Sequence, residues 1–305
     1  METKEKNRRP ATERPKRSAS QEVVYTQPAA FNKQKFVLRL LTVVAVVLAL
    51  IFGLSIFFKV DEDKVLMSFK MQRGTEQVAD VHNYTERQIL EASGIKDGEN
   101  LLTIRESEIS SRIMEKLPYV VQVRVRIKVP DTVNIEIIET DVVYAAEASD
   151  GTWWLMRSDG KIVEKTNAAD AKQNTVLLGI KLSQPKQGEQ AVALEPEPVE
   201  PEEGEEQTPV TVLASEQLST ALSICKMMEQ SGIIGTMASV DVTSLGSIEL
   251  WYGGQYQIHL GDATRLDYKI GELKPVIDYL GSSGSGMLDA SFTIKEKEVI
   301  YTPFE

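Results

Sequence analysis

The residue types that most often do chemistry are few in this chain and far apart. Its 305 residues include one cysteine, Cys225, and two histidines, His82 and His259. A structural zinc site needs four Cys or His ligands, and a lone cysteine cannot form a disulfide within the chain. Common phosphate-binding loops, nucleophile elbows, HExxH helices and CxxC pairs do not occur in the sequence. We therefore expect no catalytic residue, no metal site, no cofactor and no small-molecule substrate.

The acidic residues leave one enzymatic alternative open. Two carboxylates can hydrolyse a glycosidic bond, and sequence does not give the separation between any pair of the 45 Asp and Glu. A membrane-anchored cell-wall enzyme thus remains an alternative. Cys225 shares the apolar face of a predicted helix with Leu218 and Leu222, which indicates a buried packing residue. His259 alternates with apolar residues in a predicted strand, so we expect it on the polar face.

A long apolar segment must position everything that follows it. Residues 40–58 contain no charge and would span about 28 Å as a helix, close to the hydrocarbon thickness of a bilayer. The apolar core of a cleaved signal peptide is shorter, and no small-residue cleavage site follows the segment. We predict a single membrane-spanning helix at residues 36–58, in contact with lipid, after a disordered tail at residues 1–35.

The charge distribution predicts the orientation of that helix. The formal net charge is −11, but the first 39 residues hold ten basic side chains against four Glu. These basic residues are Lys4, Lys6, Arg8, Arg9, Arg14, Lys16, Arg17, Lys33, Lys35 and Arg39. The positive-inside rule therefore places the N-terminus in the cytoplasm and the rest outside the cell. We expect the basic tail to set the orientation of the helix and to attract lipid headgroups; a dedicated binding motif is the alternative. The rest of the chain is acidic, which argues against nucleic acid as a partner.

The residues after the span predict a first external domain at 59–140. Thr85 and Thr103 each begin a capping-box pattern for a helix, and Gly94 is placed to end the first of these helices. Residues 121–129 and 133–137 alternate strictly between apolar and polar, which predicts a hairpin with one buried face. Basic side chains on one strand should pair with polar side chains on the other. These are Arg124, Arg126 and Lys128 on the first strand, and Asn134 and Glu136 on the second.

This region resembles the POTRA domain of the FtsQ/DivIB family of bacterial division proteins. The residues that carry the resemblance run in order over about 65 positions, directly after the signal-anchor helix. They are Tyr84-Thr85, Ile89-Leu90, Ser93-Gly94-Ile95, Gly98, Asn100-Leu101-Leu102, Ile113, Leu117-Pro118-Tyr119-Val120, Val123, Val125, Pro130, Thr132-Val133, Ile135, Ile137 and Glu139. The sequence departs from the family upstream, where residues 71–83 replace a compact strand that ends in Gly-Asn.

Residues 141–305 predict a second, mostly antiparallel β domain with flanking helices. Short strands and turns dominate, and two helices are expected, one capped by Ser215 and one from Leu266 to Leu280 that contains Pro275. A stretch at about 184–212 is rich in Glu and Pro, which predicts a disordered acidic loop; calcium binding is an alternative. The overall fold class is therefore α+β: one membrane-spanning helix, a small α/β POTRA domain and a β domain.

The second domain also resembles the β domain of the FtsQ/DivIB family. The matching residues are Asp159-Gly160, Leu260-Gly261, Lys269-Ile270, Leu273, Leu280, Gly286 and Leu288-Asp289. The resemblance implies a non-catalytic scaffold at the division septum that binds FtsL-like and FtsB/DivIC-like single-span coiled-coil proteins. It also implies that a partner strand pairs with an edge strand near the C-terminus. The candidate contact residues on this chain are Phe292, Ile294, Ile300 and Tyr301. A POTRA-bearing chaperone or transport component is a further alternative.

Overall fold

The computed structural model describes residues 33–60, 62–73, 76–78, 83–195, 213–233, 237–281, 284–291 and 298–304. The chain divides into two compact units, Met1–Gly53 and Leu54–Glu305. The predicted boundary between external domains, at residue 140, falls between two sheets inside the second unit. Both sheets therefore belong to one compact unit.

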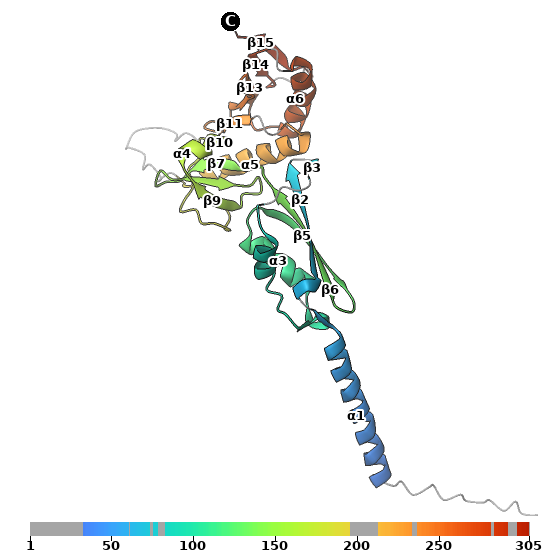
Figure 1. The fold of residues 1–305 in the computed structure, drawn as a ribbon. Helices are drawn as coiled ribbons and strands as arrows, with labels where there is room; N and C mark the ends of the chain where they lie inside the picture. Colours follow the sequence, from blue (N-terminus) through green and yellow to red (C-terminus); the bar gives the residue numbers. More distant parts are fainter. Residues whose placement is uncertain are drawn as a thin grey trace, which may run out of the picture. The chain divides into compact units, whose positions relative to one another are not determined.

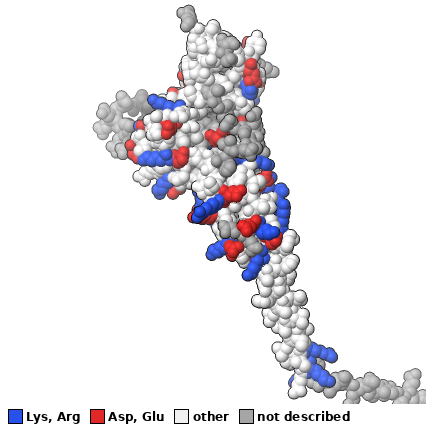
Figure 2. Space-filling model, in the orientation of Figure 1, with Lys and Arg blue, Asp and Glu red and all other residues white. Residues whose placement is uncertain are grey.

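Helix α1 (Lys33–Phe57) is long and apolar enough to cross a membrane. It has 25 residues, its most apolar stretch of 18 residues has a mean hydropathy of 2.9, and none of its side chains is buried within the protein. In Figure 2 the helix appears as an uncharged rod with basic side chains only near its N-terminal end. Its length of about 38 Å exceeds the hydrocarbon thickness of a bilayer. The helix coincides closely with the span predicted at residues 36–58.

The first sheet has the order β3-β2-β6-β5, with β2 parallel to β6 and the other pairs antiparallel. Its strands are β2 (Val65–Arg73), β3 (Glu76–Val78), β5 (Val120–Lys128) and β6 (Thr132–Thr140). Helices α2 (Glu86–Ser93) and α3 (Glu106–Lys116) bury Ile89, Ile109 and Ile113 against it. A short pair, β1 (Lys59–Val60) and β4 (Glu99–Asn100), and two 3-10 turns, η1 (Glu62–Lys64) and η2 (Leu101–Thr103), complete this region.

The structure confirms one predicted capping box and corrects the other. The Thr85 side chain accepts the backbone N–H of Gln88, the Gln88 side chain accepts that of Thr85, and Gly94 ends α2 in the left-handed conformation at φ 68°. Thr103 caps no helix: it lies in η2, and α3 begins after Arg105 without a side-chain cap. The reason is Asn100, whose side chain accepts the N–H of Leu102 at 2.9 Å and starts a 3-10 turn that includes Thr103.

The hairpin β5-β6 forms as the alternation predicted, and one of the predicted pairs, between Arg124 and Glu136, joins its strands. Arg124 lies opposite Glu136, with 3.1 Å between the guanidinium and the carboxylate. Lys70 on β2 contacts the other oxygen of Glu136 at 2.6 Å. The hydrogen bond from Lys70, aided by Arg124, holds the pKa of Glu136 below its ordinary value. The outer face of this sheet is thus linked by one carboxylate across three strands.

Among the described residues the second sheet has nine strands, in the order β15-β14-β13-β12-β11-β10-β7-β8-β9, and it is mostly antiparallel, as predicted (Figure 1). Its strands are β7 (Tyr144–Glu147), β8 (Trp153–Met156), β9 (Ile162–Thr166), β10 (Thr175–Leu178), β11 (Met237–Asp241), β12 (Ile248–Tyr252), β13 (Tyr256–Gly261), β14 (Gly286–Asp289) and β15 (Ile300–Pro303). Its helices are α4 (Ala168–Ala171), α5 (Ala214–Ser231) and α6 (Leu266–Leu280), and Pro275 lies inside α6.

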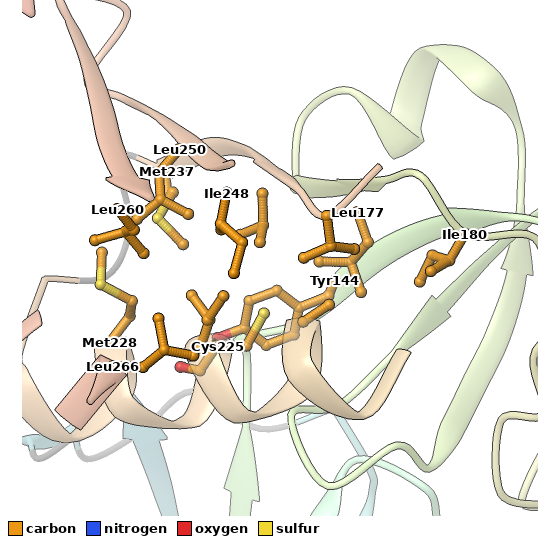
Figure 3. Packing of buried hydrophobic residues seen from close by; sticks show 14 of the residues in the cluster. Tyr144, Leu177, Ile180, Cys225, Met228, Met237, Ile248, Leu250, Leu260 and Leu266 are labelled. Carbon is orange, nitrogen blue, oxygen red and sulfur yellow. Dashed lines mark hydrogen bonds between the residues drawn. The ribbon is translucent and has the colours of Figure 1, made fainter. Parts of the chain in front are cut away.

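Helices α5 and α6 pack against one face of this sheet and create the main hydrophobic core (Figure 3). Leu218 and Cys225 on α5 and Leu273 on α6 are buried in it. Burial raises the pKa of the Cys225 thiol well above its ordinary value, so the group stays a protonated, apolar packing residue. The predicted structural role of Cys225 is confirmed by this geometry.

The N-terminus of α5 is capped by a residue from the far side of the acidic segment, and not by Ser215 as predicted. The carboxylate of Glu195 accepts the backbone N–H groups of Ala214 and Ser215, both at 2.7 Å. A carboxylate is favoured there because it also meets the positive end of the helix dipole. Hydrogen bonds from Ser215, together with the Ala214 N–H, lower the pKa of Glu195.

The first part of the predicted acidic loop lies against the sheet. Gly188 donates its N–H to the carbonyl of Ile162 at 2.9 Å, and Ile162 donates to the carbonyl of Glu189 at 2.9 Å. Ala193 is buried and bridges to Leu182. Residues 188–191 therefore cover part of the β9 edge, whereas residues 196–212 lie outside the described residues. The few apolar side chains before Pro196 explain this difference from the prediction, because they give the segment something to bury.

Polar contacts hold the first sheet to the second. Arg157, whose side chain is 11% exposed, donates to the backbone carbonyls of Pro118 at 3.0 Å and Val120 at 2.6 Å, and it also pairs with Asp159. The Tyr119 hydroxyl donates to Glu164 at 2.9 Å. Backbone carbonyls at this junction are thus satisfied by a cation from the other sheet, which fixes how the two sheets meet.

We predict that Arg157→Ala loosens this junction. Loss of the charged donor leaves two carbonyls without it and should destabilise the protein by about 2 kcal/mol, the usual contribution of a hydrogen bond to a charged group. Hydrogen exchange of the purified full chain should speed up around residues 118–120. The matched control is Arg124→Ala, because the Arg124 side chain is 46% exposed and its ion pair with Glu136 should contribute about 0.5 kcal/mol. Equal effects of the two variants would contradict the assignment.

A second prediction concerns pH. Burial raises the pKa of Glu229, which accepts hydrogen bonds from the hydroxyls of Tyr144 and Ser158, both at 2.9 Å. The folded protein therefore keeps this proton above pH 4.5, where the unfolded chain has released it. The resulting stability is complete below that pH and is lost as pH rises through the raised pKa. Glu229→Gln should flatten this fall in urea-unfolding curves recorded against pH; parallel curves would rule out the effect.

Candidate partner-binding edge

The nine-stranded sheet ends differently on its two sides. At the β9 end, residues 188–191 hydrogen-bond to Gly160 and Ile162 and cover part of the edge. At the other end lies β15, and no strand among the described residues pairs with its outer side (Figure 1). An edge strand presents unpaired backbone groups to which another chain can add. The described structure thus offers β15 as the accessible edge of this sheet.

The pairing of β15 shows which backbone groups face outward. Leu288 lies opposite Tyr301, and the N–H of Phe304 donates inward to the carbonyl of Ser285 at 3.0 Å. Because inward and outward groups alternate along an antiparallel strand, the N–H and the carbonyl of Tyr301 point away from the sheet. The backbone of Pro303, two residues later, also faces outward, but proline has no N–H to donate. The outward hydrogen-bonding positions therefore centre on Tyr301.

The close approach of β15 to β14 depends on a glycine. A Cβ atom added to Gly286 would lie 2.4 Å from the carbonyl oxygen of Thr302 and 2.6 Å from the Tyr301 ring. Contacts this short do not occur, so any side chain at this position would push the two strands apart. Gly286 is therefore a requirement of the edge, although it is not exposed itself.

Aromatic contacts fix the last strand against the rest of the sheet. The Tyr301 ring lies edge-on to Tyr256 at 6.4 Å, and its hydroxyl donates to the carbonyl of Ser285 at 3.2 Å. Phe304 stacks on Trp251 with 6.4 Å between ring centroids and 16° between ring planes. Such pairs add to the free energy gained by burying the rings. The edge is consequently held in place before any partner arrives.

The predicted contact residues separate into three groups. Ile300 is 47% exposed on the edge strand and can touch an added strand. Tyr301 lies on the same strand, but its side chain is turned toward the core, so it contributes its backbone and not its ring. Phe292 and Ile294 lie outside the described residues. Sequence reasoning missed Gly286, Trp251 and Phe304 as parts of this edge.

The outer face beside Ile300 is polar. Ile300 pairs with Asp289 on β14, which lies next to His259 on β13, and His259 lies next to Glu249 on β12. His259 is partly exposed, with 3.9 Å between its Nδ1 and Glu249 Oε1, as its predicted place on the polar face requires. No cluster of three or more His, Cys, Asp or Glu that would hold a metal occurs among the described residues. Ile300 is thus an apolar position beside a hydrophilic surface.

We predict that Gly286→Ala displaces β15. The added Cβ overlaps the Thr302 carbonyl, so stability should fall by about 2 kcal/mol and residues 300–303 should lose protection from hydrogen exchange. Gly271→Ala in α6 is the matched control, because a Cβ there meets nothing within 4 Å and favours the helix by about 1 kcal/mol. Retained protection at 300–303 in Gly286→Ala would contradict this prediction, because it would show that the two strands accommodate the added Cβ without separating.

Comparison with known protein families agrees with this architecture. A family model described as POTRA domain, FtsQ-type, matches residues 77–140, the region of α2, α3 and the β5-β6 hairpin. No curated protein matches the chain. The match covers residues 77–140 of the domain predicted at 59–140 and confirms the resemblance found in the sequence. The chain therefore carries an FtsQ-type POTRA domain, which supports its assignment to the FtsQ/DivIB family.

Proposed function

We propose that this protein is a non-catalytic, membrane-anchored scaffold of the bacterial division machinery. The observation that carries the proposal is the FtsQ-type POTRA domain that directly follows a helix able to span a membrane. A domain of this type suggests a division-related role through protein–protein contacts. The apolar helix would hold those contacts at the membrane surface.

The proposed orientation places the N-terminus in the cytoplasm and both sheets outside the plasma membrane, at the division septum. Basic side chains at the beginning of α1, Lys33, Lys35 and Arg39, favour this direction. The residues near the other end of α1 carry both signs of charge. The scaffold would then present the nine-stranded sheet to other proteins on the outer side of the membrane.

The proposed partners are FtsL-like and FtsB/DivIC-like single-span coiled-coil proteins, captured by strand addition at β15. Main-chain hydrogen bonds to Tyr301 would supply affinity, and alternate side chains of the added strand would contact Ile300. Pro303 lacks an N–H and would limit the added strand at its end. Support for this mode comes from the outward groups of β15 and from the aromatic contacts that hold the strand ready to pair.

The wall-enzyme alternative finds no comparable support among the described carboxylates. Glu229 is buried with a raised pKa, as a general acid often is, yet both of its oxygens already accept hydrogen bonds from Tyr144 and Ser158. These bonds account for its burial in structural terms. We therefore propose no reaction for this site.

The proposal predicts that Ile300→Asp weakens partner capture. A carboxylate on the edge would have to lose its hydration when an apolar partner side chain covers it, at a cost of about 2 kcal/mol or roughly thirtyfold in affinity. The measurement is affinity capture of the small coiled-coil proteins by the tagged full-length chain from gently solubilised membranes. Tyr279→Asp is the control, because Tyr279 is 90% exposed on α6, a helix that packs against a face of the sheet and is not part of its edge.

Two outcomes would contradict the proposal. Equal capture by both variants, with the chain folded, would remove β15 as the contact. No capture by the unaltered chain would remove the scaffold function itself, and turnover of isolated peptidoglycan by the same preparation would support an enzyme.

A further inference from the structure

The exposed large apolar side chains of the first external domain are few, and each lies on a segment close to the point where the chain leaves α1. Among the described residues from 59 to 140 they are Leu66, Leu102 and Val129, which are 52%, 62% and 67% exposed. Single exposed apolar residues need no explanation, but a shared location does. Each of the three is connected through short contacts to the chain that leaves α1.

Leu102 is held beside the end of α1. It lies in η2, whose first residue, Leu101, donates its N–H to the carbonyl of Phe58 at 2.9 Å. Asn100, one residue earlier, pairs with Lys59 in the β1-β4 ladder and donates its side-chain N–H to Ser55 Oγ at 3.3 Å. Ser55 belongs to the last turn of α1. Leu102 is therefore fixed near the point at which α1 ends.

Val129 and Leu66 lie at the same end of the first sheet. Val129 is in the β5-β6 turn, where Asp131 forms an ion pair with Lys64 at 3.6 Å. Lys64 immediately precedes β2, and Val65 pairs with Val133 just beyond the turn. Only β1 and η1 separate α1 from this point. The β5-β6 turn and the start of β2 thus share the end of the domain that the chain enters from α1.

Lysine side chains accompany the apolar ones. Lys59 and Lys128 are exposed, and Lys64 is half-exposed beside its ion pair with Asp131. Lysine places its apolar stem along a hydrophobic surface and its ammonium group at the polar boundary. Such groups are attracted to lipid phosphates. Exposed apolar side chains flanked by lysines are the composition expected at a membrane interface.

We propose that Leu66, Leu102 and Val129, with Lys59 and Lys128, form a rim that inserts into the headgroup region of the bilayer spanned by α1. The bilayer is the partner of this surface because Ser55 and Phe58, at the end of the spanning helix, are hydrogen-bonded to the segment that carries Leu102. The inference rests on the proposed membrane anchoring. The rim holds the POTRA domain on the lipid surface, and it gives the domain a function in membrane contact besides protein binding.

The test uses the full-length chain in phosphatidylcholine vesicles that contain phosphatidylglycerol. A spin label is attached to Leu102→Cys or Val129→Cys, and its exposure to a water-soluble nickel chelate and to oxygen is measured. The native Cys225 is fully buried and does not react in the folded protein. Gln122→Cys is the matched control, because it is an exposed position on β5 about 20 Å along the strand from the turn.

A label on Leu48→Cys in α1 tests the membrane anchoring itself, so that a failure of the anchoring can be told apart from a failure of the rim. We expect labels at 48, 102 and 129 to lose exposure to the nickel chelate and the label at 122 to keep it. Labels at 102 and 129 as exposed as the one at 122, with 48 protected, would overturn the rim alone. A fully exposed label at 48 would overturn the anchoring and the rim together.

Discussion

The packing of α5 and α6 against a single face of the nine-stranded sheet is the constraint on which the rest of the structure after α1 depends. Each fully buried leucine or isoleucine there contributes about 2 kcal/mol, and the cluster draws side chains from both helices and from strands across the sheet. Tyr144 at one end of this core connects to Glu229 and so to the junction with the POTRA domain. Tyr256 at the other end supports the ring of Tyr301 on the edge strand.

Helices that cover one face of a sheet do not pair the backbone groups at its two edges. On the β9 side, residues 188–191 form hydrogen bonds with the edge. On the β15 side, the strand contains Pro303 and lies close to Gly286 of β14. A proline on an edge limits unwanted pairing without removing it. The result is an edge whose available hydrogen bonds are few and well defined, as a specific strand-addition site requires. Phe304 stacked on Trp251 restricts the strand further.

Periodicity in the sequence predicted much of this fold, because local patterns determine local elements. The β5-β6 hairpin, helix α6 and the burial of Cys225 all follow from apolar spacing that tertiary packing reinforces. The caps at Thr103 and Ser215 were wrong because Asn100 starts a 3-10 turn that includes Thr103, and because Glu195 caps α5 in place of Ser215. Glu195 lies about twenty positions before the helix that it caps, and no local pattern reveals such a partner. The edge contacts of Gly286 and Trp251 are equally non-local.

The cap on α5 also has a consequence for how this chain can vary. Glu195 and Ala214 are joined by a hydrogen bond, so the ends of the intervening segment are fixed by the folded domain whatever its length. The entropy lost on closing a loop grows only logarithmically, by about 0.6 kcal/mol for each doubling of its length. Insertions or deletions between Pro196 and Val212 should therefore be nearly neutral for folding. This makes the segment a natural place to accept a tag or an inserted domain without disturbing either sheet.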